Sequence, residues 1–193
     1  MVNDMQKINF TDKAIHFTRH NLKIFVSIFV SILILFLSFF FFKNLQEKNS
    51  IKIADQYTQA SILVKQKKIL ESKLLLESII SENHQFYSPM ALYLIIDNNI
   101  VSEKLKIISF FDKILNNNSI GKENLNLIKI KKAIYLIGLD NEKLIIETLN
   151  PIINSNSVWR NIAINLISEY FMSKNQIVKA KEYIQLLNKN NNK

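Results

Sequence analysis

The sequence predicts an all-α protein with a single N-terminal transmembrane helix, followed by a TPR-like (tetratricopeptide-like) α-solenoid of about four helical hairpins. An apolar run near the beginning is long enough to span a bilayer. Only 2 glycines and 2 prolines occur in 193 residues, whereas sheet-rich domains need glycine in their tight turns. Beyond the run, apolar residues recur at helical spacing, which favours helices over strands.

The apolar run extends from Ile24 to Phe42 and contains no charge, proline or glycine. As a helix it would measure about 28 Å, at ~1.5 Å per residue, close to the ~30 Å hydrocarbon core of a bilayer. Its polar residues are Ser27, Ser31 and Ser38, whose hydroxyls can bond to carbonyls of the same helix. We therefore predict a membrane-spanning helix in contact with lipid.

Two other interpretations of this run fit less well. A cleaved signal peptide typically has about 7–15 apolar residues followed by small residues, whereas this run is longer and ends in four phenylalanines before KNLQEKNS. A helix of a soluble protein would show a polar stripe at a period near 3.6 residues. We therefore predict that the run is a membrane anchor that is not cleaved from the protein.

The first four helices after the anchor follow from capping residues and apolar spacing. Ser50 is expected to cap the first. In the third, Ser88 is expected as the cap and Pro89 as the first helical residue, where a missing N–H costs nothing. Ser102 with Glu103 begins the fourth. These helices are expected over 51–67, 69–83, 89–96 and 103–115.

Turn signals separate the last four helices. The cluster NNNSIG precedes the fifth helix, and GLDN ends it. The sixth is expected to stop at Pro151, because proline lacks the N–H that would continue the ladder. Ser157 is expected to cap the seventh. These helices are expected over 122–139, 142–150, 158–174 and 176–189.

Eight helices with short connections predict four antiparallel hairpins. Their first helices begin near 51, 89, 122 and 157, a spacing that brackets the tetratricopeptide period of about 34 residues. Tight helix crossings need small side chains, and the second hairpin fits poorly because Leu92 and Lys104 occupy its small positions. An irregular eight-helix bundle is the alternative. The structural repeat positions are predicted at Ala60, Ala133, Trp159, Ala163, Ser168 and Ala180.

The composition excludes several classes of site. The chain has no cysteine, so it contains no disulfide, thiolate chemistry or cysteine metal site. The formal charge of +9 is of the sign expected for a protein that binds nucleic acid. However, Arg19 and Arg160 are the only arginines, and proteins that read base sequence depend on arginine for bidentate contacts. The lysines are scattered, which indicates solvated helix surfaces and no nucleic-acid partner.

The residues predict neither an enzyme nor a bound cofactor. His16 and His20 have a spacing that can hold a metal on a helix face, but no third ligand is near them. His84 stands alone in a loop. Phosphate-binding loops and nucleophile elbows need glycines that this chain lacks. We therefore expect no catalytic residue, no metal site, no cofactor and no small-molecule substrate.

Three stretches carry a resemblance to a known family. They are ADQYTQASILVKQKKILESKLLLESI, FYSPMALYLI and SVWRNIAINLISEYFMSKNQIVKAKEYIQLL. In the third, Trp159, Arg160 and Ala163 match a W-R-x-x-A helix start, and Ala180 matches the alanine of the last repeat. With the anchor, these stretches make the chain resemble the ancillary SecYEG translocon subunit family in its alphaproteobacterial form, although Asn175 or Lys68 replaces the usual turn glycine.

The resemblance implies a role and a location, since the family has no catalytic residues to carry over. It implies a scaffold in the bacterial inner membrane whose helical domain lies in the periplasm and binds translocon subunits and periplasmic chaperones. Charge does not decide the orientation, because three basic residues flank each end of the run. The implied regions are a cytoplasmic tail (1–23), transmembrane helix (24–42), juxtamembrane linker (43–50), TPR-like helical domain (51–189) and disordered tail (190–193).

A partner-binding groove is expected on the concave face formed by the first helix of each hairpin. If the repeat register holds, Tyr57, Tyr93, Ile130 and Ile134 point into it. Packing of some of these in the core is the alternative. A second functional hypothesis is a structural adaptor of another envelope assembly, in division or outer-membrane biogenesis, that uses the same groove for one fixed partner.

Overall fold

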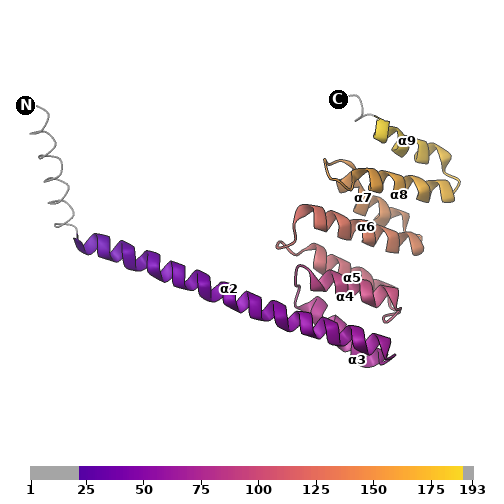
Figure 1. Cartoon of the computed structure of the whole chain (residues 1–193). Helices are drawn as coiled ribbons and strands as arrows, with labels where there is room; N and C mark the ends of the chain where they lie inside the picture. Colours follow the sequence, from indigo (N-terminus) through magenta and orange to yellow (C-terminus); the bar gives the residue numbers. More distant parts are fainter. Residues whose placement is uncertain (1–21, 189–193) are drawn as a thin grey trace, which may run out of the picture. The chain divides into compact units, whose positions relative to one another are not determined.

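The structure, a computed structural model, describes residues 22–188 and contains eight helices and no strand among them. This confirms the all-α fold (Figure 1). His16, His20 and the expected tail 190–193 lie outside the described residues. The helices are α2 (Leu22–Lys65), α3 (Ile69–Ser81), α4 (Tyr87–Asp97), α5 (Lys104–Leu115), α6 (Lys122–Gly138), α7 (Glu142–Ile153), α8 (Arg160–Ser173) and α9 (Ile177–Asn188).

The chain forms two compact units, Met1–Lys52 and Ile53–Lys193, which are described separately. In the first, α2 is long and apolar enough near the N-terminus to cross a membrane. The Ser31 hydroxyl donates to the carbonyl of Ser27 at 2.9 Å, as expected for serine in an apolar helix. Residues 43–50 are helical and Ser50 lies inside α2, so the prediction of a cap there is wrong. Without proline or glycine, nothing in this stretch stops the helix.

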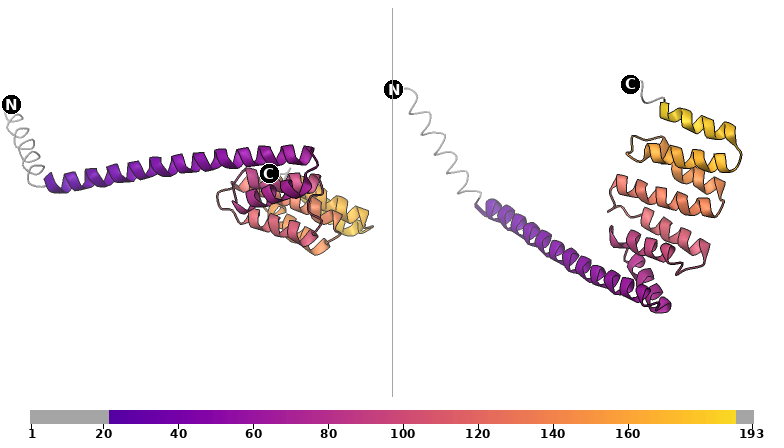
Figure 2. Two further views of the ribbon diagram at one scale, coloured as in Figure 1. Left: turned by 90° about the horizontal axis from the view of Figure 1, so that it is seen from below. Right: turned by 45° about the vertical axis from the view of Figure 1, so that its right-hand side comes forward.

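The second unit is a stack of helical hairpins in chain order (Figures 1 and 2). The last part of α2 pairs with α3, and the pairs α4–α5, α6–α7 and α8–α9 follow. Buried side chains form two core clusters. One extends from Ile53 in α2 to Ile128 in α6, and the other from Ile130 in α6 to Ala180 in α9. Packing is sparser in the pairs α4–α5 and α5–α6 than in α6–α7 or α8–α9.

Most of the predicted repeat positions are fully enclosed. Ala60, Ala133, Ala163 and Ala180 are 0% exposed, and Ser168 is 2% exposed. At such positions any larger side chain would have to displace a neighbouring helix. Trp159 is half-buried and packs against the second core cluster.

Three of the hydrogen bonds between neighbouring hairpins share one separation along the chain. The side chain of Asn117 donates to the carbonyl of Asn83, and the hydroxyl of Ser157 donates to Glu123 at 2.6 Å. The amide of Gln176 donates to Glu142 at 3.4 Å. In each case the two residues are 34 positions apart, which is the separation expected of equivalent sites in successive repeats.

The first helix of every hairpin ends in a left-handed residue that is not glycine. Lys67, Asn99, Asp140 and Asn175 have φ values of 59°, 50°, 54° and 57°. After Lys67, the N–H of Lys68 bonds to the carbonyl of Leu63 at 3.0 Å, and the other three turns repeat this bond one residue after the left-handed position. This is the Schellman arrangement that glycine usually provides. The left-handed residue of the first turn is therefore Lys67, and Lys68, with φ of −84°, is not in the glycine position.

Replacing Lys67 with glycine should stabilise the domain. A side chain with a Cβ pays roughly 1–2 kcal/mol in the left-handed region, and glycine does not, although it adds entropy to the unfolded chain. We expect Lys67→Gly to raise the free energy of unfolding by about 0.5–1 kcal/mol, measured by urea titration of the full chain in detergent with circular dichroism. Lys68→Gly is the matched control, because it gains no such relief. A Lys67→Gly variant no more stable than Lys68→Gly would contradict the assignment.

Two other predicted boundaries are corrected. Ser88 lies inside α4 and its hydroxyl donates to the carbonyl of Ile79 at 2.7 Å, so it does not cap the helix. The cap is His84, whose Nδ1 accepts backbone N–H groups of the first turn. Helix α7 continues past Pro151. Proline removes a single backbone N–H at an exposed position, whereas Ile152 and Ile153 in the same turn are buried and hold the turn in the core. Ser157 does cap the turn that leads into α8, and accepts the N–H of Trp159 at 3.1 Å.

Candidate functional site

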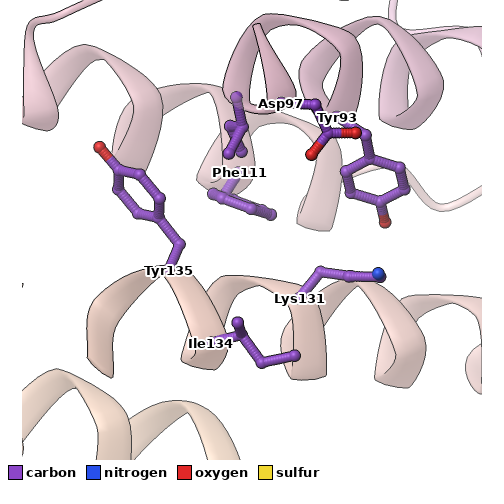
Figure 3. Close-up of a pocket in the computed structure, with 7 residues that line it drawn as sticks. Tyr93, Asp97, Phe111, Lys131, Ile134 and Tyr135 are labelled. Atoms are coloured by element: carbon purple, nitrogen blue, oxygen red, sulfur yellow. The ribbon is translucent and has the colours of Figure 1, made fainter. Parts of the chain in front are cut away.

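A hollow opens between the first helices of the second and third hairpins, with α5 behind it (Figure 3). Its volume is about 260 Å³. Clefts for drug-sized ligands usually measure about 300–1,000 Å³, so the hollow suits one or two side chains of a docked segment. The lining residues are Tyr93, Ile96 and Asp97 of α4, Phe111 of α5, and Lys131, Ile134 and Tyr135 of α6.

Aromatic rings form much of the wall. The Phe111 ring is fully buried and lies with its centre 6.2 Å from that of Tyr135. Tyr93 is half-buried, and this burial raises the pKa of its hydroxyl to about 12. At neutral pH the hydroxyl therefore stays protonated and can donate a hydrogen bond to an occupant.

Two charges of opposite sign lie at the rim. The Lys131 ammonium lies 5.8 Å from the centre of the Tyr93 ring, within range of a cation–π interaction. Asp97 is one turn after Tyr93 and is exposed. Among the described residues neither charge forms an ion pair. The rim can therefore offer a donor from α6 and an acceptor from α4 to the backbone or side chains of a partner.

Two of the four residues predicted for the groove line this hollow, and two do not. Tyr93 and Ile134 line it, and Ile134 is 50% exposed. Tyr57 packs its ring against Tyr87 at 5.8 Å in the first core cluster. Ile130 is 4% exposed in the second core cluster, so its predicted place in the groove is wrong. It precedes Ile134 by about one turn, but its side chain is covered by the neighbouring hairpin.

The sequence prediction missed Ile96, Asp97, Phe111, Lys131 and Tyr135. One signal was available, because Asp97 follows Tyr93 by four positions and therefore lies on the same face of a helix. Phe111 belongs to the second helix of its hairpin, and only the three-dimensional packing brings it behind the first helices. The hollow itself arises because α6 packs against α8 while α4 and α6 approach each other less closely.

No group of three or more histidine, aspartate or glutamate side chains that could hold a metal occurs within residues 22–188. Comparison of the chain with protein-family models, with curated proteins and with solved structures finds no match. The function therefore has to be inferred from the chain's own residues.

Proposed function

We propose that this protein is a membrane-anchored interaction scaffold whose helical hairpins bind partner proteins through the hollow between α4 and α6. The observation that carries the proposal is this open hollow, where exposed Ile134 and the half-buried ring of Tyr93 stand beside unpaired charges. Apolar and aromatic anchors surrounded by polar groups are typical of protein-binding surfaces. The apolar part of α2 supports attachment to a membrane.

The proposed place of action is the SecYEG translocon of the bacterial inner membrane. The TPR-like domain would face the periplasm and bring secreted chains together with periplasmic folding factors. The resemblance of the sequence supports this place of action. Three inter-hairpin bonds at a separation of 34 residues, the tetratricopeptide period, support the TPR-like character of the domain. A tether to the membrane raises the local concentration of partners, so a shallow hollow of modest affinity is sufficient.

The test combines topology and partner capture in intact cells. A photo-cross-linking residue replaces Ile134, and a tag follows Lys193. The expected result is that protease reaches the tag only from the periplasmic side and that translocon subunits are captured. A tag reached only from the cytoplasm contradicts the proposed orientation. Capture of one different envelope complex supports the adaptor hypothesis instead.

Placing a charge in the hollow should abolish most of the partner capture. Ile134 is half-exposed, so Ile134→Arg should leave the free energy of unfolding within about 0.5 kcal/mol of the parent. The photo-cross-linking residue is placed at position 93 in this experiment. Loss of an interface anchor typically costs at least ~2 kcal/mol of binding free energy, so capture from position 93 should fall by more than about tenfold. The matched control is Leu105→Arg, because Leu105 is 81% exposed and lies outside the hollow. Equal capture by both variants would exclude the hollow as the binding site.

A further inference from the structure

The first turn of α4 is capped by an imidazole. Nδ1 of His84 accepts the backbone N–H of Phe86 at 3.1 Å and that of Tyr87 at 3.2 Å. The His84 carbonyl accepts the N–H of Ser88 at 3.2 Å, the first bond of the helical ladder. His84 therefore takes the N-cap role that serine, threonine or aspartate usually fills. Unlike those residues, it changes its hydrogen-bonding ability near neutral pH.

We propose that His84 is a pH-sensitive cap whose protonation opens the first turn of α4 and loosens the join between the first and second hairpins. A neutral imidazole has one nitrogen that accepts, whereas both nitrogens of an imidazolium donate. Protonation at Nδ1 therefore breaks both bonds to the backbone. It also places a positive charge at a helix N-terminus, where the helix dipole disfavours cations.

The surroundings of the His84 ring also favour its neutral form over its protonated form. The ring centre lies 5.2 Å from that of Tyr87, whose ring lies 5.8 Å from that of Tyr57 on α2. Glu82, the acidic group that follows the end of α3, is exposed. Burial lowers the pKa of His84. Because the folded state binds this proton more weakly than the unfolded chain, the cap stabilises fully above about pH 6.5 and its contribution is lost as pH falls below it.

The turn that His84 holds is a structural join. Ser88, in this first turn, ties α4 to α3 through its bond to the Ile79 carbonyl. Phe86, which the cap also holds, is 58% exposed at the surface. Opening of the turn would release both residues and change how the first hairpin meets the second. This inference does not depend on the proposed function.

The test is amide hydrogen exchange of the full chain in detergent at about pH 7.5 and about pH 5.0, with rates corrected for the intrinsic effect of pH. The readout is the peptide that begins at His84 and covers the first turns of α4. In the parent chain we expect its protection to fall about tenfold at the lower pH, the effect of losing an N-cap. In His84→Asn, which accepts the same bonds at either pH, protection should not change.

An internal reference separates the cap from a general loss of stability. Amides of α8, which lies outside this join, should keep their protection at the lower pH. An equal loss of protection in α8 would overturn the proposal, and so would an equal fall in His84→Asn. If His84→Asn folds poorly by circular dichroism, His84→Ser provides the same non-titrating acceptor.

Discussion

Replacing Phe171 with alanine should lower the free energy of unfolding by about 3–5 kcal/mol, because the substitution leaves a cavity where α8 meets α9. Phe171 is 1% exposed. Its ring is stacked on that of Tyr183 of α9, with the centres 5.6 Å apart and the planes at 14°. The ring of Tyr170 lies 5.5 Å away, and the Lys179 ammonium lies 5.0 Å from the Phe171 ring centre. Loss of this ring therefore removes contacts with both α8 and α9, the two helices of the last hairpin.

The measurement is a urea titration of the full chain in detergent, followed by the fluorescence of Trp159. This is the chain's only tryptophan, and it packs against the same core cluster. Met172→Ala is the matched control, because Met172 is the next residue along α8 and is 43% exposed. We expect the control to cost less than about 1 kcal/mol. Similar losses in the two variants would show that Phe171 does not hold the last two helices together.

The hairpin architecture could be predicted because local and tertiary signals agree along most of the chain. Apolar spacing located the helices, and the need for small residues at crossings located Ala60, Ala133 and Ala180, all of which are fully buried. Helix boundaries were harder. Pro151 was expected to end a helix, but burial of the two isoleucines after it carries α7 one turn further. Tertiary packing outweighed a local signal at this site.

Caps and turns show the limit of residue preferences. Serine is a common N-cap and histidine a rare one, so the residue preferences pointed to Ser88 and gave no signal for His84. The Ser88 hydroxyl instead reaches a carbonyl of the previous helix, an interaction that depends on how the hairpins pack. In the same way, Lys67 carries no sequence signal for a left-handed turn, and only the bonds of the turn identify it.

The candidate site was only half predictable for a geometric reason. A helical period identifies the face that is buried, but the exposure of residues beside that face depends on the neighbouring helix. Ile130 and Ile134 lie about one turn apart on α6, yet one is enclosed by the second core cluster and the other remains half-exposed. This difference accompanies the closer approach of α6 to α8 than to α4. The different exposure of Ile130 and Ile134 therefore cannot be predicted from the α6 sequence alone.

Replacing Ser157 with alanine should lower the free energy of unfolding by about 2–3 kcal/mol, although the change removes only one oxygen atom. The hydroxyl donates to Glu123 at 2.6 Å and accepts from the side chain of Asn126 at 3.0 Å and from the N–H of Trp159 at 3.1 Å. Ser157 and Asn126 are 7% and 5% exposed. Without the hydroxyl, the buried amide of Asn126 loses this acceptor and is poorly placed to find water. An unpaired buried polar group costs more than the average value of the bond it once made.

The control for this prediction is Ser102→Ala, because Ser102 is exposed and its hydroxyl can exchange protein partners for water. We expect Ser102→Ala to change the free energy of unfolding by less than about 0.5 kcal/mol. A double-mutant cycle with Asn126→Leu then tests the cause. If the unpaired amide is responsible, Ser157→Ala should cost markedly less when Asn126 is already leucine, because the amide donor of Asn126 is then absent in both chains. Equal costs in both backgrounds would exclude the unpaired Asn126 amide as the source and assign the loss to the other two bonds of the hydroxyl, to Glu123 and from the N–H of Trp159.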